Sequence, residues 1–289
     1  LAHRKDRQRW QWRRECAAVK KYMGKIYMVL IFLFMYAPIF LLMVFSFNST
    51  KSRSVWTGFS LRWYQELFRD AEIIHAIKIT LLVAVFSAVL STILGTAAAL
   101  GIFAMKKRPR KFLMNVNTLP TMKPDIIMGV SLMLLFIFFS QTLRMDFFTL
   151  GFGTLLLAHI TFDTPYVLLC VMPKLRQMDK RQYEAALDLG AGSMQAFFRV
   201  VLPQITTGIV TGLIMAFTLS IDDVVVSYFT SGPTSQTLGV LIFGMTKKRI
   251  SPEINALCTL MFVFILLLLI VINLRELRAE RERERNINR

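Results

Sequence analysis

Long apolar runs alternate with short basic clusters along this chain, and this alternation most constrains how it can fold. Each apolar run is close to the roughly twenty residues that a helix needs to cross a bilayer. The runs lie at 26–47, 79–105, 125–141, 152–172, 205–228 and 255–273. Because a soluble domain would spread charges of both signs along its length, a soluble enzyme is excluded, as are collagen and disordered chains. The pattern predicts an all-α, polytopic membrane protein with six transmembrane helices.

The distribution of lysine and arginine between the loops predicts the orientation of the spans. The terminal segments, 106–123 and 173–204 together hold 26 of these residues, against 8 in the alternate loops. Since basic loops stay in the cytoplasm, both termini are expected there. The formal net charge of +17 would also suit a nucleic-acid partner. Most of the basic residues flank apolar spans, however, so no such partner is expected.

Composition divides the chain into three parts. Residues 1–25 form a basic tail that contains Trp10 and Trp12, 26–273 form the transmembrane domain, and 274–289 form a tail of alternating arginine and glutamate. The basic tail either lies on anionic membrane lipid through its charges and aromatic rings or serves only as a topology signal. The C-terminal tail has the charge spacing of a solvated helix.

The cytoplasmic loop 173–204 is too long for a turn and too regular for a linker. Asp179 and Gln182 have the spacing of a capping box that opens a short helix, and Gly190 supplies the backbone freedom for a change of direction. Ser193 is expected to cap a second short helix before the fifth span. Large apolar side chains recur on one face of that helix at Met194, Phe197, Phe198 and Val201. This apolar surface must be covered, either by the cytoplasmic ends of the spans or by a partner protein.

The same loop carries a motif that resembles the membrane-spanning permease subunits of ATP-binding-cassette importers. The family signature is Glu-Ala-Ala, three residues, Gly, nine residues and Ile-x-Leu-Pro. This chain matches it at Glu184, Ala185, Ala186, Gly190, Leu202 and Pro203, and departs from it only at Val200, which replaces isoleucine. The resemblance implies the fold of a type I importer permease. It also implies that these residues form a coupling helix that docks in a groove of a separate ATP-hydrolysing subunit.

The sequence contains no recognisable motif for nucleotide binding or catalysis. A glycine-rich phosphate loop ending in Gly-Lys-Ser or Gly-Lys-Thr does not occur, so ATP and magnesium are expected on the partner ATPase and no cofactor on this chain. His3, His75 and His159 are too scattered along the chain to indicate a metal site. An enzymatic role is therefore not expected.

Several further segments resemble the C-type permease subunits of spermidine/putrescine importers. These segments are 58–64, 158–162, 219–227, 231–233 and 251–256. The resemblance covers nearly all of the chain after residue 26 and implies import of polyamines across a bacterial inner membrane. It also implies a second permease subunit, two ATPase subunits and an extracytoplasmic substrate-binding protein as partners. The second permease is either a related chain or another copy of this one.

Two other functions stay open at the level of sequence. Related permeases carry other cations, iron complexes, opines or anions, so the cargo can differ while the class of transporter stays the same. A self-sufficient secondary transporter would need inverted repeats and ion ligands at broken helices, and no clear repeat relates the two halves of this chain.

Three aspartates lie within or at the end of predicted spans, where a charge is costly and usually functional. Asp222 and Asp223 fall near the outer end of the fifth span, where they are expected to meet the ammonium groups of a cation together with the ring of Tyr228. Alternatively, these acids cap a helix end or pair with a basic residue. Asp163 falls near the middle of the fourth span, and an internal pair with His159 one turn earlier is the competing explanation for it.

Small residues repeat every four positions in the second span, at Ser87, Ser91, Gly95 and Ala99. Such a face lets another helix approach closely in lipid. It indicates either packing inside the bundle or an interface with another subunit. In the first outer loop, Trp56, Trp63 and Tyr64 are expected to be interfacial anchors.

Overall fold

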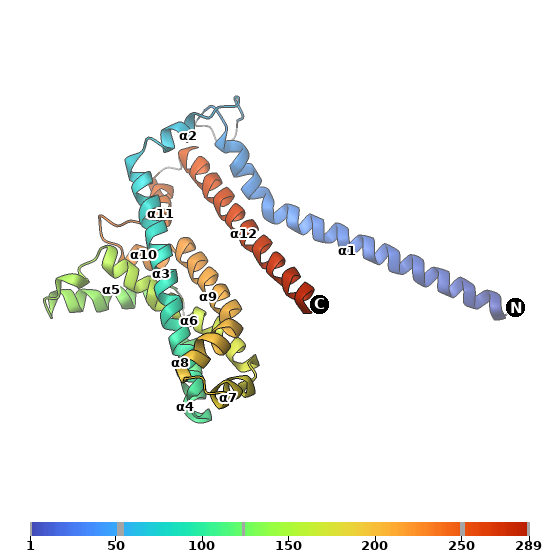
Figure 1. The fold of residues 1–289 in the computed structure, drawn as a ribbon. Coiled ribbons are helices and arrows are strands. Elements are labelled where there is room, and N and C mark those ends of the chain that lie inside the picture. Colours follow the sequence, from blue (N-terminus) through green and yellow to red (C-terminus); the bar gives the residue numbers. More distant parts are fainter. Residues whose placement is uncertain (1, 51–54, 123–124, 249–251, 288–289) are drawn as a thin grey trace. The chain divides into compact units, whose positions relative to one another are not determined.

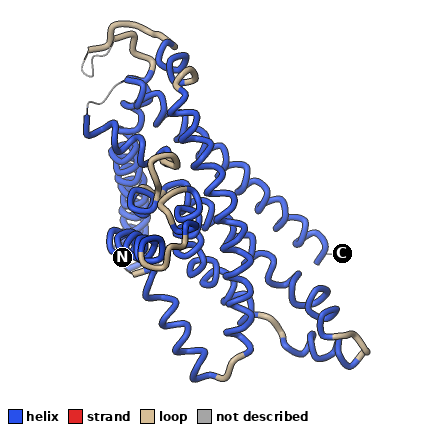
Figure 2. The backbone as a smooth tube through the Cα atoms, turned by 90° about the vertical axis from the view of Figure 1, so that its left-hand side faces the viewer, coloured by secondary structure: helices blue, strands red, loops and turns tan. Residues whose placement is uncertain are grey.

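The structure is a computed structural model that describes residues 2–50, 55–122, 125–248 and 252–287. Within these ranges the backbone consists of helices and loops (Figure 2), apart from one isolated antiparallel bridge between Asn48 and Phe59. The all-α class predicted from the sequence is confirmed. The chain forms two compact units, residues 1–69 with 250–289 and residues 70–249, which are described separately.

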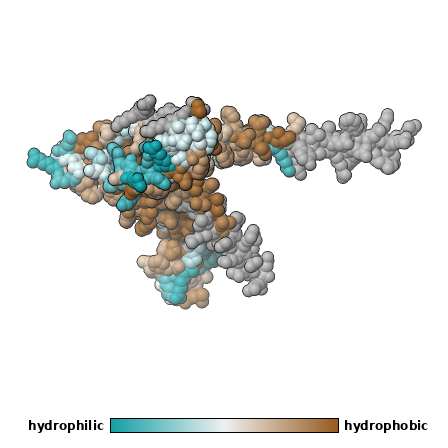
Figure 3. All heavy atoms as spheres, turned by 90° about the horizontal axis from the view of Figure 1, so that it is seen from above, coloured by the Kyte–Doolittle hydropathy of each residue, from teal (hydrophilic) through white to brown (hydrophobic). Residues whose placement is uncertain are grey.

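The first unit contains two long helices and a short one. The helix α1 runs over Ala2–Ser46 with Pro38 inside it, and α12 runs over Pro252–Ile287 and packs against α1 and against α2, Arg62–Leu67 (Figure 1). Hydrophobic side chains cover the described part of α1 (Figure 3). This is expected for Met23–Ser46, a segment of 24 residues that is apolar enough to cross a bilayer. The backbone of both charged tails thus continues the adjoining helices.

Trp63 is a buried residue of this unit, and its prediction as an interfacial anchor is wrong. Its side chain is 1% exposed, and its indole Nε1 donates a hydrogen bond of 2.6 Å to the carbonyl of Asn48. The neighbouring Tyr64 hydroxyl lies 2.8 Å from the Ser46 hydroxyl at the end of α1. The two aromatic residues of α2 therefore fasten this short helix to the C-terminal end of α1.

The second unit is built around α3, Ala71–Ala104, α6, Phe152–Gln177, and α9, Leu202–Asp222, which pack against one another (Figure 1). One core cluster of small and branched side chains joins them. Its fully or almost fully buried members are Ala88, Ala99, Ile102, Val167, Leu168, Val171, Met172, Leu175, Val201, Ile205 and Ala216.

Shorter elements complete the second unit. They are α4, Lys107–Thr121; α5, Asp125–Gln141; a 3-10 turn, Asp146–Phe148; α7, Lys180–Asp188; α8, Ser193–Ala196; a π-helical turn, Phe197–Val201; α10, Val225–Thr230; and α11, Leu238–Lys248. The helix α4 packs on α6, α10 packs on α5 and α6, and α11 packs on α3. The Thr80 hydroxyl of α3 accepts a hydrogen bond of 2.8 Å from the backbone N–H of Leu238, where α11 begins.

The small-residue face of α3 is used for packing inside this unit. Gly95 lies so close to α6 that a Cβ on it would stand 2.8 Å from Val167 Cβ, and the Ser87 hydroxyl donates a 3.0 Å hydrogen bond to Ser220 of α9. Ser91 and Ala99 are buried as well. Of the two interpretations of this face, internal packing is therefore the correct one.

A methyl group on Gly95 is expected to destabilise the unit, whereas one on Gly101 of the same helix is not. The Cβ on Gly95 would also meet the Thr164 carbonyl oxygen at 3.0 Å, and the Cβ on Gly101 would meet nothing within 4 Å. Overpacking of this kind costs about 1–3 kcal/mol. Replacing a helical glycine in open space gains about 0.5–1 kcal/mol. Thermal unfolding of Gly95→Ala and Gly101→Ala in detergent should shift the midpoint in opposite directions, and equal shifts would contradict the packing described here.

Four helical segments of the described chain are long and apolar enough to cross a bilayer, namely Met23–Ser46, α3, α6 and Ser193–Asp222. The helices α4 and α5 qualify only as a pair, with a bend of 99° between them. The described apolar part of α12, Glu253–Leu267, is shorter than a span. The count of six spans therefore stays a prediction. The fifth span, expected at 205–228, is wrong at its outer end because the helix stops at Asp222.

Candidate functional site

The first part of the candidate site is α7, which begins at a capped end in the loop after α6. The side chain of Asp179 accepts a 3.0 Å hydrogen bond from the backbone N–H of Arg181, which confirms Asp179 as the cap. The expected capping box is incomplete, because Gln182 accepts a 2.8 Å hydrogen bond from the Gln204 side chain instead of reaching back to the cap. This bond joins α7 to the first turn of α9.

Gly190 ends α7 in the left-handed conformation, with φ of +86°. The N–H of Gly190 donates to the carbonyl of Leu187, and the N–H of Ala191 donates to the carbonyl of Ala186. Together these two bonds form a Schellman motif, which satisfies carbonyls that the helix end would leave unpaired. Side chains other than asparagine or aspartate are strained at such a φ, so the sharp turn predicted at Gly190 has a specific backbone cause.

The second helix of the loop differs from its prediction. Its N-cap is Gly192, and Ser193 is its first residue and makes no capping bond. The helix continues from α8 through the π-helical turn into α9 without a break, so it belongs to the fifth span rather than standing apart from it. Pro203 does not interrupt the helix because it is the second residue of α9, where its missing N–H costs only a bond to the π-helical turn.

The residues of the coupling motif divide into exposed and half-buried positions around this turn. Glu184, Ala185 and Gly190 are exposed, whereas Ala186 and Leu202 are half-buried. Pro203 is exposed.

Large apolar side chains surround the exposed motif residues. Leu189 is 89% exposed, Met194 is 68% exposed and Phe198 is 56% exposed. The other face of the loop is covered by its own bundle, since Tyr183, Phe197 and Val201 pack in the core cluster of α3, α6 and α9. The surface formed by Glu184, Leu189, Met194 and Phe198, called the docking surface below, is suited to binding another protein.

The second part of the candidate site is the break between α9 and α10. Asp223 leaves the helical conformation, and its carboxylate accepts hydrogen bonds of 3.1 and 2.7 Å from the backbone N–H groups of Val226 and Ser227. The Ser227 hydroxyl donates to the same carboxylate at 2.8 Å. Asp223 therefore caps α10, as the alternative interpretation of this acid predicts. Asp222, on the last turn of α9, and Tyr228, on α10, are both exposed.

A buried row of polar side chains ties this break to the bundle. His159 of α6 lies 2.7 Å from the Ser220 hydroxyl through Nδ1 and 3.0 Å from the Ser227 hydroxyl through Nε2. Ser220 also accepts from Ser87, and Ser227 donates to Asp223. The row thus connects α3, α9, α6 and α10. Its five side chains, each hydrogen-bonded to the next, are Ser87, Ser220, His159, Ser227 and Asp223.

The donor and the acceptor of each hydrogen bond in the row can be assigned by starting from its last member, Asp223. The hydroxyl proton of Ser227 goes to Asp223, so the oxygen of Ser227 accepts from the Nε2–H of His159. Nδ1 is then the unprotonated nitrogen and accepts from the hydroxyl of Ser220. Every donor therefore points along the row toward the carboxylate of Asp223, whose oxygen Oδ2 also lies 3.7 Å from Nε2.

Asp163 lies one turn further along α6 and does not share in this row. Its side chain is fully buried, and neither carboxylate oxygen has a hydrogen-bond partner among the described residues. The predicted pair between His159 and Asp163 is therefore wrong. The three candidate acids occupy three different environments, since Asp222 is exposed, Asp223 caps a helix and Asp163 is buried.

The sequence does not identify Ser220 and Ser227 as partners of His159. A hydroxyl within an apolar run is a weak signal, because it bonds equally well to the carbonyl one turn earlier. Three helices have to come together before these serines meet the imidazole.

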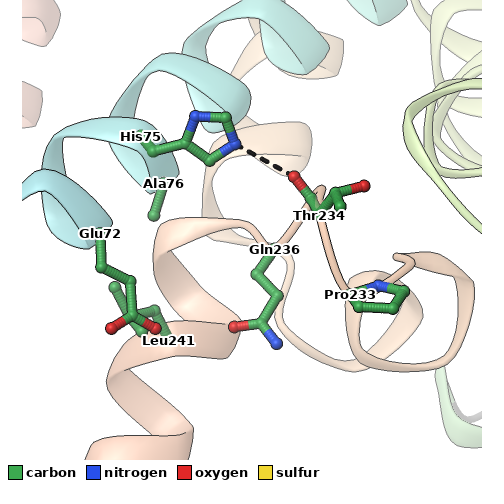
Figure 4. A pocket seen from close by; sticks show the side chains of 7 residues that line it. All are labelled: Glu72, His75, Ala76, Pro233, Thr234, Gln236 and Leu241. Carbon is green, nitrogen blue, oxygen red and sulfur yellow. Dashed lines mark hydrogen bonds between the residues drawn. The ribbon is translucent and has the colours of Figure 1, made fainter.

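One cavity opens between the first turns of α3 and the loop before α11 (Figure 4). It has a volume of about 330 Å³ and is lined by Glu72, His75, Ala76, Pro233, Thr234, Gln236 and Leu241. The Nε2 of His75 donates a 3.0 Å hydrogen bond to the Thr234 carbonyl, which fixes the ring against the loop. No cluster of three potential metal ligands occurs among the described residues.

Comparisons with known proteins agree with a transport role. Residues 91–275 match the protein family described as "Binding-protein-dependent transport system inner membrane component". The chain is 41% identical over 238 residues to the putrescine transport system permease protein PotI of Escherichia coli (strain K12), covering 82% of this chain and 84% of that protein. It is 37% identical over 237 residues to the spermidine/putrescine transport system permease protein PotC of the same strain, covering 82% and 87%.

A solved structure with a similar fold belongs to a bacterial ABC transporter involved in the import of the acidic polysaccharide alginate. It matches with a TM-score of 0.69 and 18% identity, covering 89% of this chain and 94% of that one. At this level of identity the likeness shows the fold alone.

Proposed function

This chain belongs to the family of binding-protein-dependent transport system inner membrane components, and we propose that it imports polyamines. Membership in the family makes it a transport subunit of the inner membrane and not an enzyme. The observation that carries the choice of cargo is its similarity, over four-fifths of its length, to permeases named for putrescine and for spermidine with putrescine. The cargo of this chain is accordingly putrescine, spermidine or both.

The docking surface couples this chain to an ATPase subunit. Exposed Glu184 and the exposed apolar residues beside it support this assignment, because a surface of large apolar side chains in water is costly unless a partner covers it. ATP and magnesium bind that partner, and its movement is passed to the span through the bond between Gln182 and Gln204 and through the unbroken helix from Ser193 to Asp222. Two ATPase subunits serve a pair of permeases.

The break after α9 lies on the path of the substrate. Non-helical backbone at membrane depth is tolerated only where protein buries it or where it borders a water-filled cavity. The exposed carboxylate of Asp222 and the exposed ring of Tyr228 offer a cation both charge and an aromatic face there. Asp223 and His159 hold the break in place, and Asp163 contributes to the interior of the bundle.

Six spans with both termini in the cytoplasm complete the proposed arrangement. The excess of 26 basic residues over 8 between alternate loops supports this orientation. The helix α5, which coincides with the predicted third span at 125–141, supplies one span, and α12, which has 36 residues, supplies the last. The basic tail serves as a topology signal or lies against anionic lipid on the cytoplasmic side.

Two further partners complete the importer. A second permease, either a relative of this chain or another copy of it, forms the other half of the translocation path. A binding protein delivers the substrate from outside, and a related fold has been solved with a periplasmic protein bound.

Another small solute remains the second candidate for the cargo. The alginate importer shares this fold at a TM-score of 0.69, so the fold by itself does not select a cation. Competition between polyamines, other cations and anions for uptake separates the two.

Uptake in whole cells tests the proposed cargo. Cells that lack this chain but keep its partner subunits are expected to take up labelled putrescine or spermidine only when the chain is supplied. A tenfold excess of unlabelled polyamine should suppress that uptake, and an anionic sugar acid at the same concentration should not. If the chain is present in the membrane but does not restore uptake, polyamines are not its cargo, and the assignment to this class of transporter is unaffected.

A further inference from the structure

Two aromatic rings from neighbouring helices form an exposed corner at the outer part of the second unit. Tyr228 of α10 and Phe243 of α11 are 50% and 42% exposed. Their ring centroids are 6.1 Å apart and their planes meet at 83°, in a T-shaped arrangement. Aromatic faces carry negative potential, and two of them at an angle make a site for a cation.

The side chain of Lys247 occupies this corner. Its ammonium nitrogen lies 4.4 Å from the centroid of Phe243 and 5.6 Å from the centroid of Tyr228. Both distances are within the range of about 6 Å in which a cation is attracted to a ring. Among the described residues Lys247 forms no ion pair, so the rings are its observed electrostatic partners. The corner thus already holds a primary ammonium.

We propose that Tyr228 and Phe243 form an ammonium-binding subsite for the polyamine, and that Lys247 is a tethered occupant which the substrate displaces. The lysine side chain consists of four methylene groups ending in an ammonium, which corresponds to putrescine without one of its two ammonium groups and to the butyl arm of spermidine. A site that accepts the one therefore accepts the other in shape and charge. This proposal rests on the polyamine import proposed above and assigns it a contact point.

A tethered occupant has a definite effect on substrate binding. The subsite is open to a polyamine only in the fraction of molecules in which Lys247 has left, and the apparent affinity falls in proportion to that fraction. The occupant also keeps the charge of the corner satisfied when no substrate is present. Putrescine or spermidine that binds there releases the Lys247 amine into water.

The released amine can be measured directly. The complete importer, with its ATPase, second permease and binding protein, is placed in lipid nanodiscs and treated briefly with a water-soluble acylating ester. Mass spectrometry then gives the rate of acylation at Lys247 and at Lys78, an exposed lysine of α3 that serves as the internal reference. Putrescine should raise the rate at Lys247 at least threefold in a saturable manner, and tetramethylammonium, which prefers aromatic faces to carboxylates, should do the same. Butane-1,4-diol, with the same carbon chain and no charge, should have no effect.

A ring variant provides the matched control. In Tyr228→Leu with Phe243→Leu, Lys247 should react fast without ligand and should not respond to putrescine. Tyr228→Phe keeps the ring face and should behave like the wild type. Equal rates at Lys247 with and without putrescine, or the same response in the ring variant, would show that Lys247 is a plain interfacial anchor and overturn the proposal.

The two proposals fail in different ways. If cells show no polyamine uptake, the proposed cargo is wrong, and the subsite as a polyamine contact is wrong with it. If uptake is normal but putrescine does not change the rate of acylation at Lys247, the proposed cargo is supported and only the proposed subsite is overturned.

Discussion

Gly190→Val is expected to reduce ATP-driven uptake at least tenfold while the chain stays in the membrane. A Cβ at this position would meet nothing within 4 Å, so the substitution creates no clash. The cost comes from the backbone, because φ is +86° and a β-branched residue is a strong outlier there. A left-handed residue costs roughly 1–2 kcal/mol. Relief of this strain unwinds the Schellman motif and moves the exposed part of α7 away from its docking geometry.

Two substitutions at and near this turn separate the conformation from the side chain. Gly190→Asn adds a side chain but tolerates the left-handed region, and uptake should stay within about twofold of the wild type. Gly192→Val adds the same side chain two residues later, also in open space, at a residue with φ of −66°, and its uptake should be affected less than that of Gly190→Val. Uptake of labelled putrescine and the amount of ATPase that copurifies with the chain are the measurements. If the two valine variants lost activity equally, the turn would not be the cause.

Asp222→Asn and Asp223→Asn are expected to fail by different routes although the residues are neighbours. Asp222 is exposed on the last turn of α9, so its loss should weaken uptake about tenfold and leave stability unchanged. Tenfold corresponds to about 1.4 kcal/mol of interaction with the cation. Asp223 accepts two backbone N–H groups and the Ser227 hydroxyl through both of its oxygens. Because the amide nitrogen of asparagine cannot accept a hydrogen bond, Asp223→Asn loses at least one of these bonds, which costs about 1 kcal/mol and lowers the unfolding temperature.

Paired measurements of uptake and thermal unfolding distinguish these routes. Asp222→Glu keeps the charge and should recover most of the uptake. A normal rate of polyamine uptake in Asp222→Asn would make this acid structural, and an unchanged unfolding temperature in Asp223→Asn would contradict the cap described here.

Much of the fold is readable from the sequence because it depends on local patterns. Apolar runs placed α3, α5 and α6 close to their observed positions, and the turn at Gly190 followed from the residue that adopts a left-handed backbone most readily. The cap at Asp179 was equally local. These features need only neighbours within a few residues.

The remaining features depend on partners that are distant in the sequence. The apolar run of the fifth span continues past Asp222, so hydropathy alone does not show that Asp223 turns away to cap α10. Helical spacing favours a pair between His159 and Asp163, but the imidazole forms its hydrogen bonds with serines of two other helices instead. Trp63 is of the residue type that forms interfacial anchors, but its indole N–H donates to the carbonyl of Asn48 and its ring is buried.

The most direct test of the central claim uses liposomes that contain this chain with its ATPase and second permease, with binding protein and labelled putrescine on the outer side. Putrescine should accumulate inside only when ATP is present on the side of the docking surface. Glu184→Lys should abolish the accumulation, whereas Asp188→Lys, which reverses the same charge on α7 at a variable position of the motif, should retain more of it. Accumulation without ATP, or undiminished accumulation in Glu184→Lys, would contradict an importer that is driven through this surface.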